Sequence, residues 1–296
     1  MSGHTAQHAR PNHTSDAKHR KHTTKPTPAA TTSTPAAAGS ASASASATPA
    51  PVTSTPAQAS PSAVASTTSS APASTSSCTT SAAQGSCGPY TYPQMQGTST
   101  APTVNNDVWS PISGWQQTLH ANNPGDWGVT ANMPAGNTAV VSYPSNEATY
   151  GERSLSSFSK ITSSFSETMN ATSKTSAWAA YDIWGNNWGY EVMIQHDFAN
   201  NGACSYVATA DFGGSNGVPV QKWGLCQYGT ELIWKLTSGS EQSGSVDILA
   251  MLTWLESHGY LPSNSTLTAI GYGWEICSTG GANENFQVNS YSITES

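Results

Sequence analysis

Large aromatic side chains are confined to one part of this chain. All ten Trp and all five Phe of the 296 residues lie from Trp109 onward, whereas residues 1–85 are mostly Ala, Ser, Thr and Pro. A segment without large apolar side chains cannot bury enough surface to offset the conformational entropy lost on folding. We therefore predict a disordered tail and linker over residues 1–85, and one folded domain over residues 86–296.

The charge divides in the same way as the aromatic residues. Residues 1–85 carry a net charge of +4 and the whole chain carries −7, which leaves −11 for the remainder. An acidic domain repels phosphate groups, so we expect no nucleic-acid partner. Strong charges make up only 9% of the residues, and this neutral polar composition suits a hydroxyl-rich ligand.

The cysteines allow two disulfide bonds. Two pairs would each close a short loop, Cys78 with Cys87 and Cys204 with Cys226, and Cys277 is left over. No stretch is long and apolar enough to span a membrane, and no Cys or His group has metal-site spacing. We expect a secreted or cell-surface monomer without a metal or cofactor. The basic N-terminus lacks the apolar core of a signal peptide, so the export route stays open.

Short segments rich in Val, Ile, Thr, Tyr and Trp alternate with Gly, Asn and Pro turn signals after residue 87. Many short strands with this spacing predict an all-β sandwich or jelly roll. The predicted strands are Thr138–Tyr143, Trp178–Trp184, Tyr190–Gln195, Tyr206–Ala210, Glu231–Leu236 and Thr266–Trp274.

One segment has the period of a helix instead. Apolar residues between positions 248 and 255 recur at i, i+3, i+4 and i+7, which places them on one helix face. Ser245 is the predicted N-terminal cap and Gly259 the predicted C-terminal stop. We expect one helix at 246–258, packed outside the sheets.

Two glutamates interrupt strongly apolar strands. In the sequence YEVMIQ at 190–195, strand alternation places Glu191 opposite the apolar face. In GYGWEIC at 271–277, Glu275 lies on the face opposite Tyr, Trp and Ile. Acidic residues are depleted in strands, so each one indicates either a cleft or a solvated sheet face.

A third acid, Asp182, shares its strand face with Trp178 and Trp184. Hydrolysis of a glycosidic bond needs two carboxyl groups, which act as nucleophile and proton donor when configuration is retained. Tryptophan rings next to them can stack against sugar rings. Alternation alone does not show that the three strands are neighbours.

These segments resemble the motifs of glycoside hydrolase family 12, which contains mainly endo-β-1,4-glucanases and xyloglucanases. The YEVMIQ strand is similar to the family's nucleophile strand, and Gly273–Cys277 is similar to its acid/base segment. Tyr181–Trp184 resembles the family segment whose Asp hydrogen-bonds the nucleophile. Asn106–Trp109 resembles the segment whose Trp stacks on sugar. The resemblance covers about residues 104–294.

The resemblance implies a jelly-roll sandwich of two curved antiparallel sheets with one external helix. It further implies a retaining endo-β-1,4-glucanase, cellulase-like, that hydrolyses β-glucan with Glu191 as nucleophile, Glu275 as acid/base and Asp182 as their partner. The expected substrate-binding residues are Trp109, Met193, Gln195, Trp184 and Trp274.

The sequence departs from the family pattern at three positions near the predicted site. Gln195 replaces a Trp, Cys277 replaces an aromatic residue, and Asp107 stands where the family has Asn. The first two changes alter the expected wall of the cleft, and with it the substrate preference.

Three other functions are compatible with the same features. A lectin-like glucan-binding domain would share the fold without cutting its ligand, since fold alone does not define function. A xylanase of the related family 11, or a xyloglucanase, would cut a different polysaccharide. A purely structural surface protein is the third alternative. The three acids on the predicted site face favour hydrolysis of a glucan.

Overall fold

The computed structural model describes residues 74–79, 90–91, 102–108 and 110–296. The predicted tail up to residue 73, Trp109, and the side chains of the predicted Cys78–Cys87 pair lie outside the described residues. A strand at Ser74–Thr79 falls within the stretch that the sequence assigns to the linker. The domain boundary itself stays a prediction.

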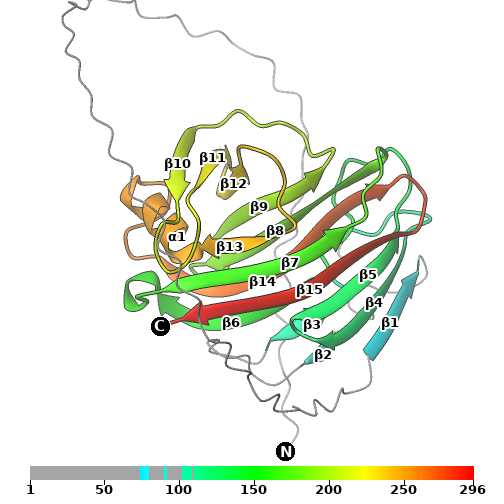
Figure 1. The fold of residues 1–296 in the computed structure, drawn as a ribbon, viewed down its shortest axis with the longest axis horizontal. Helices are drawn as coiled ribbons and strands as arrows, with labels where there is room; N and C mark the ends of the chain where they lie inside the picture. Colours follow the sequence, from blue (N-terminus) through cyan, green and yellow to red (C-terminus); the bar gives the residue numbers. More distant parts are fainter. Residues whose placement is uncertain (1–73, 80–89, 92–101, 109) are drawn as a thin grey trace, which may run out of the picture. The chain divides into compact units, whose positions relative to one another are not determined.

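The described residues form two packed β-sheets with one α-helix, which confirms the predicted fold class (Figure 1). The larger sheet has nine strands. In spatial order these are β10 (Ala208–Phe212), β11 (Gln221–Tyr228), β12 (Glu231–Leu236), β9 (Tyr190–Ala199), β8 (Thr175–Gly185), β14 (Thr266–Thr279), β6 (Ser145–Ser154), β3 (Thr103–Asn105) and β2 (Tyr90–Thr91).

The smaller sheet has six strands and packs against the first. Its spatial order is β1 (Ser74–Thr79), β4 (Gln116–Asn123), β5 (Asp126–Asn132), β15 (Glu284–Glu295), β7 (Ile161–Met169) and β13 (Ser243–Asp247). Among the described pairs, all are antiparallel except β12 with β9, which run parallel. The expected antiparallel arrangement therefore holds for every described pair except this one.

The core lies between the two sheets and is rich in aromatic rings. Strand alternation directs one set of side chains of the nine-stranded sheet into this core, including Tyr181, Ile194 and Trp274. The Trp274 ring meets Trp127 of the other sheet edge to face, with ring centroids 5.2 Å apart. This burial drives the association of the sheets.

Helix α1 (Ile248–Ser257) confirms the single predicted helix. Its buried face consists of the apolar residues whose spacing predicted it. The cap differs from the prediction, because Ser245 lies in β13 and the side chain of Asp247 accepts the backbone N–H of Ala250 at 3.1 Å. Gly259 adopts a φ of +76° directly after the helix, as a C-terminal stop requires.

Most of the predicted strands appear, and Glu231–Leu236 has the predicted bounds. Thr138–Tyr143 is wrong, because this segment makes only isolated bridges through Ser142 to Val108 and Ile276. Its backbone groups pair with two different segments at once, so no ladder extends along it.

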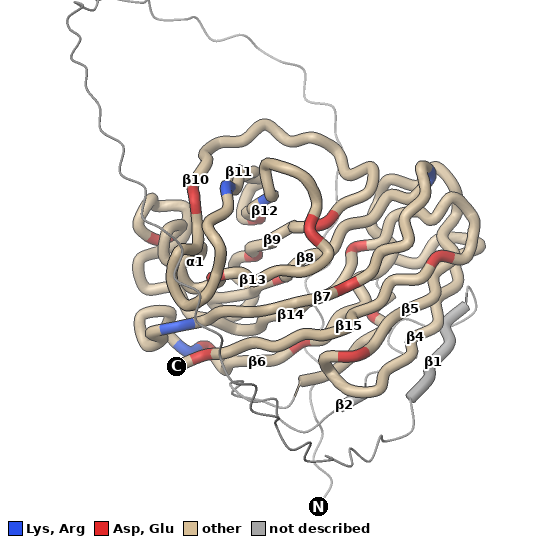
Figure 2. Tube along the Cα trace, viewed as in Figure 1, with Lys and Arg blue, Asp and Glu red and all other residues tan. Residues whose placement is uncertain are grey.

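Acidic side chains outnumber basic ones over the described residues, in agreement with the predicted charge of the domain (Figure 2). In this part of the chain, no helix is long and apolar enough to cross a membrane.

Candidate active site

The three predicted catalytic carboxyls come from three adjacent strands. Glu191 lies on β9, Asp182 on the central strand β8, and Glu275 on β14. Strand β8 pairs Trp184 with Glu191 on one side and Trp178 with Glu275 on the other. Directly paired residues point to the same face of a sheet. All three acids therefore lie on the face that points away from the six-stranded sheet, which we call the site face.

Asp182 is held in place by its own strand. The indole Nε1 of Trp184 donates a hydrogen bond to Oδ2 of Asp182 at 2.9 Å. Both side chains are buried, with 4% of Asp182 and 5% of Trp184 exposed. A hydrogen bond in a dry environment fixes the orientation of this carboxyl.

The Glu275 carboxyl also receives an indole hydrogen bond, because Nε1 of Trp178 donates to its Oε2. The neighbouring Cys277 is a buried free thiol. Burial, and then the negative charge of Glu275, raise the pKa of this thiol to about 12. The Cys277 thiol next to Glu275 is therefore neutral and unreactive at physiological pH.

Glycines on β14 let a second segment approach the site face closely. A Cβ at Gly273 would lie 2.0 Å from the carbonyl oxygen of Pro144, so no other residue fits there. Next to it, the hydroxyl of Tyr143 donates to the carbonyl of Ala180 at 3.0 Å. The segment around Tyr143 and Pro144 is thereby fixed beside the acids.

The predicted substrate-binding residues are not equally placed. Trp184 and Met193 lie on the site face, but only 1% of Met193 is exposed, since it packs against Cys226 and Ile233. Trp274 is a correction: it is fully buried in the core between the sheets and cannot contact a sugar. Its position next to Glu275 in the chain is the reason, because successive strand residues point to opposite faces.

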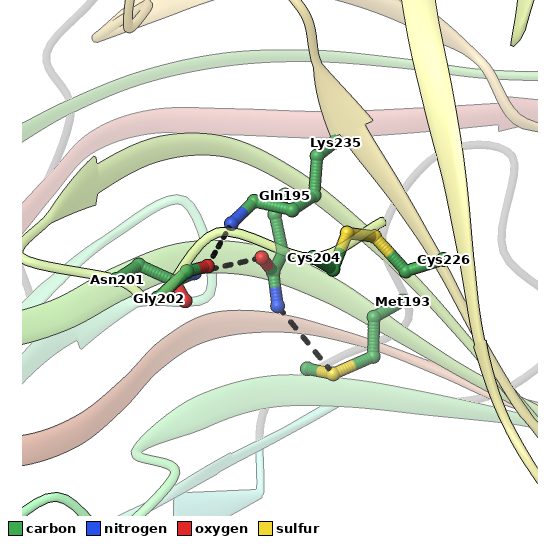
Figure 3. The surroundings of a disulfide bond; sticks show 7 residues. All are labelled: Met193, Gln195, Asn201, Gly202, Cys204, Cys226 and Lys235. Atoms are coloured by element: carbon green, nitrogen blue, oxygen red, sulfur yellow. Dashed lines mark hydrogen bonds between the residues drawn. A yellow bond between two sulfur atoms is a disulfide. The ribbon is translucent and has the colours of Figure 1, made fainter. Parts of the chain in front are cut away.

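Gln195 is also buried, with 3% of the residue exposed, and its amide serves an internal contact. The Nδ2 of Asn201 donates to Oε1 of Gln195 at 2.8 Å, and Nε2 of Gln195 lies 4.0 Å from Sδ of Met193 (Figure 3). Gln195, at the position where the family resemblance leads us to expect a Trp, therefore hydrogen-bonds Asn201 in the loop that follows β9.

That loop, residues 200–207, covers part of the site face. The disulfide between Cys204 and Cys226 ties it to β11, as the sequence predicted. Nζ of Lys235 on β12 donates to the carbonyl of Gly202 at 3.0 Å (Figure 3). We call residues 200–207 the covering segment.

Sequence reasoning missed several side chains on this face. Glu231 pairs directly with Glu191 across the parallel junction, and Lys235 pairs with Gln195. The alternation in ELIWKL, with Leu232, Trp234 and Leu236 in the core, could have placed both residues on the site face. The parallel pairing that brings them beside β9 has no local signal.

A second carboxyl pair lies in the core behind the site. Glu167 of β7 is 2% exposed and lies close to Asp197 of β9. Burial, and then the interaction with Asp197, raise the pKa of Glu167 to about 9. This pair is buried inside the core and does not reach the site face. Within the described residues, no cluster of His, Cys, Asp and Glu could hold a metal ion.

Comparisons with known proteins give relatives in sequence and in structure. Endoglucanase S of Pectobacterium parmentieri is 30% identical over 200 residues, which cover 58% of this chain and 74% of that protein. No protein-family profile matches the chain.

Solved structures of family 12 enzymes share the fold. The xyloglucanase domain of NopAA, a type three effector from Sinorhizobium fredii in complex with cellobiose, superposes with a TM-score of 0.56 at 25% identity, covering 70% of this chain and 96% of that one. A family 12 xyloglucanase from Bacillus licheniformis gives a TM-score of 0.59 at 22% identity, covering 75% and 100%. The chain belongs to glycoside hydrolase family 12, whose members hydrolyse O-glycosyl bonds.

Proposed function

We propose that this protein is a retaining endo-β-1,4-glucanase in which Glu191 is the nucleophile and Glu275 the acid/base. The observation that carries the proposal is the placement of Glu191, Asp182 and Glu275 on one face of three adjacent strands. Two carboxyl groups on the same face can act from both sides of one glycosidic bond.

The reaction proceeds in two steps. Glu191 attacks the anomeric carbon while Glu275 protonates the leaving glycosidic oxygen, which yields a glycosyl-enzyme. Glu275, now ionised, removes a proton from a water molecule that attacks the same carbon, and the sugar leaves with its configuration retained. The Trp178 indole orients Glu275 in both of its protonation states.

Asp182 acts as a positioning residue for Glu191. It lies two residue pairs along the ladder from Glu191, at the next position on the same face, and the Trp184 indole holds its carboxyl. A fixed carboxyl beside the nucleophile restricts the orientation of the nucleophile and makes its surroundings more polar.

The substrate proposed is a soluble β-1,4-linked glucan. The support is that the similar curated protein is named an endoglucanase, and that one similar solved domain is a xyloglucanase in complex with cellobiose. The covering segment and Gln195 alter the wall of the site, so xyloglucan is the second substrate to compare.

The test uses Glu191→Ala and Glu275→Ala with soluble β-glucan, and measures new reducing ends. We expect each variant to lose at least about 10³-fold in kcat. Added azide should restore turnover to Glu191→Ala by occupying the space of the missing nucleophile, and NMR should show a glycosyl azide of inverted configuration.

Undiminished hydrolysis by either variant would rule out its assigned role. Binding of glucan by the wild-type protein without any product would instead indicate a lectin-like domain. An inverted anomer as the first wild-type product would contradict retention. Secretion and a monomeric state remain predictions, which fractionation of the producing cells and light scattering can check.

A further inference from the structure

Tyr228 and Glu231 continue the row of side chains that contains Glu191. Strand β12 pairs Glu231 with Glu191, and strand β11 pairs Tyr228 with Glu231. Paired residues share a sheet face, so all three side chains point to the site face. Adjacent strands are about 4.8 Å apart, which places Tyr228 roughly 10 Å from Glu191 in the direction across the strands.

The middle site-face positions of β11 and β12 are covered. On β11, Cys226 forms the disulfide to the covering segment, and a Cβ at Gly224 would meet the ring of Tyr206 at 2.5 Å. On β12, Ile233 and Lys235 are buried. Among the described residues of these two strands, three site-face positions stay accessible to solvent: Glu231 and Tyr228 in the row of Glu191, and Lys222 at the other end of β11.

Tyr228 stands out by its exposure, because 56% of the residue is accessible although it is a large aromatic. Trp184, the other aromatic residue of this row, is buried and bound to Asp182. An exposed aromatic ring on a ligand-binding face offers a flat apolar surface with a polar hydroxyl at its edge. The carboxyl of Glu231 next to it accepts hydrogen bonds from hydroxyl groups.

We propose that Tyr228 and Glu231 form a sugar-binding subsite beyond Glu191, on the side of β12 and β11. The ring of Tyr228 stacks against a neutral pyranose ring, and Glu231 accepts a hydrogen bond from one of its hydroxyls. This subsite rests on the proposed function, because its ligand is the continuation of the glucan that Glu191 and Glu275 cut. The covering segment closes the middle of both strands, so the glucan continues from Glu191 over Glu231 and Tyr228.

The test measures binding separately from cleavage. In a Glu275→Gln background, calorimetry compares cellohexaose and cellobiose binding to the parent protein with binding to variants that also carry Tyr228→Ala or Glu231→Gln. We expect Tyr228→Ala to weaken cellohexaose binding roughly five- to tenfold, and cellobiose binding much less. Gln227→Ala is the matched control, since Gln227 is an exposed neighbour on the opposite face of the same strand.

The outcomes separate this subsite from the proposed function. Unchanged cellohexaose binding in both Tyr228→Ala and Glu231→Gln would overturn the subsite, while hydrolysis by the wild type would leave the proposed function intact. Binding that depends on Tyr228 in a protein that makes no product would support the subsite and refute the hydrolase. Equal weakening by Gln227→Ala would show a general loss of fold, and would also count against the subsite.

Discussion

Asn201 donates a hydrogen bond from Nδ2 to Oε1 of Gln195 at 2.8 Å, which joins the covering segment to strand β9. Gln195 is buried, so loss of this bond leaves a polar group without its partner in a dry environment. We expect Gln195→Ala and Asn201→Ala each to lower the free energy of unfolding by about 1–2 kcal/mol. A double-mutant cycle by urea denaturation should give a coupling of about 1 kcal/mol. Additive effects would show that the two side chains act independently.

The disulfide Cys204–Cys226 restrains the unfolded chain over a sequence separation of 22 residues. Replacement of both cysteines by Ser should lower the free energy of unfolding by about 3 kcal/mol, because the unfolded chain gains loop entropy. The measurement is urea unfolding, with reduction of the wild type as a parallel check. A stability equal to that of the oxidised wild type would contradict a structural role for the bond.

The absence of a side chain at Gly224 leaves the space that the ring of Tyr206 occupies. A Cβ at this position would lie 2.5 Å from two ring atoms, so Gly224→Ala must displace Tyr206 from strand β11. We expect a loss of about 1–3 kcal/mol in the free energy of unfolding from this overpacking. Gly202→Ala is the matched control in the same region, because its Cβ meets no atom within 4 Å. Equal stabilities of the two variants would refute the contact.

Trp178 supplies the hydrogen bond that orients the Glu275 carboxyl. Trp178→Phe keeps an aromatic ring but removes the donor, so kcat on β-glucan should fall roughly tenfold with little change in KM. Trp254→Phe on helix α1 is the control, since that ring packs on His258 and Tyr260 and not on the site face. Full activity of Trp178→Phe would remove Trp178 from the proposed mechanism.

Glu167 makes stability depend on pH, since burial raises its pKa from an ordinary 4.5 to about 9. Because the folded pKa is the higher one, the folded protein holds more protons than the unfolded chain between about pH 4.5 and 9. The free energy of unfolding therefore falls as pH rises through this window, by at most about 1.4 kcal/mol per pH unit. Above pH 9 this contribution is lost.

Glu167→Gln stays neutral at every pH, so it should remove this slope. Urea denaturation at several pH values between 5 and 9 should show a smaller decline for the variant than for the wild type. An unchanged decline would mean that Glu167 is already ionised in the folded protein near neutral pH.

Local sequence patterns were sufficient to predict helix α1 and the faces of the strands that carry the three acids. Alternation placed Glu191, Glu275 and Asp182 opposite the apolar faces, since side chains in a strand change sides at every residue. The same rule placed Trp274 in the core, so its predicted contact with substrate disagreed with its own strand pattern. The spacing of apolar residues determined helix α1, because helix periodicity is a local property.

The neighbours of each strand became known from the assembled sheets. Strand β8 lies between the two glutamate strands, and β12 runs parallel to β9, so Glu231 lies beside Glu191 although 40 positions separate them. Pairing of distant strands depends on the whole sheet and leaves no mark in either segment. The covering segment illustrates this: its disulfide was predicted from cysteine spacing, but only the fold showed that it buries Gln195 and leaves Tyr228 and Glu231 open.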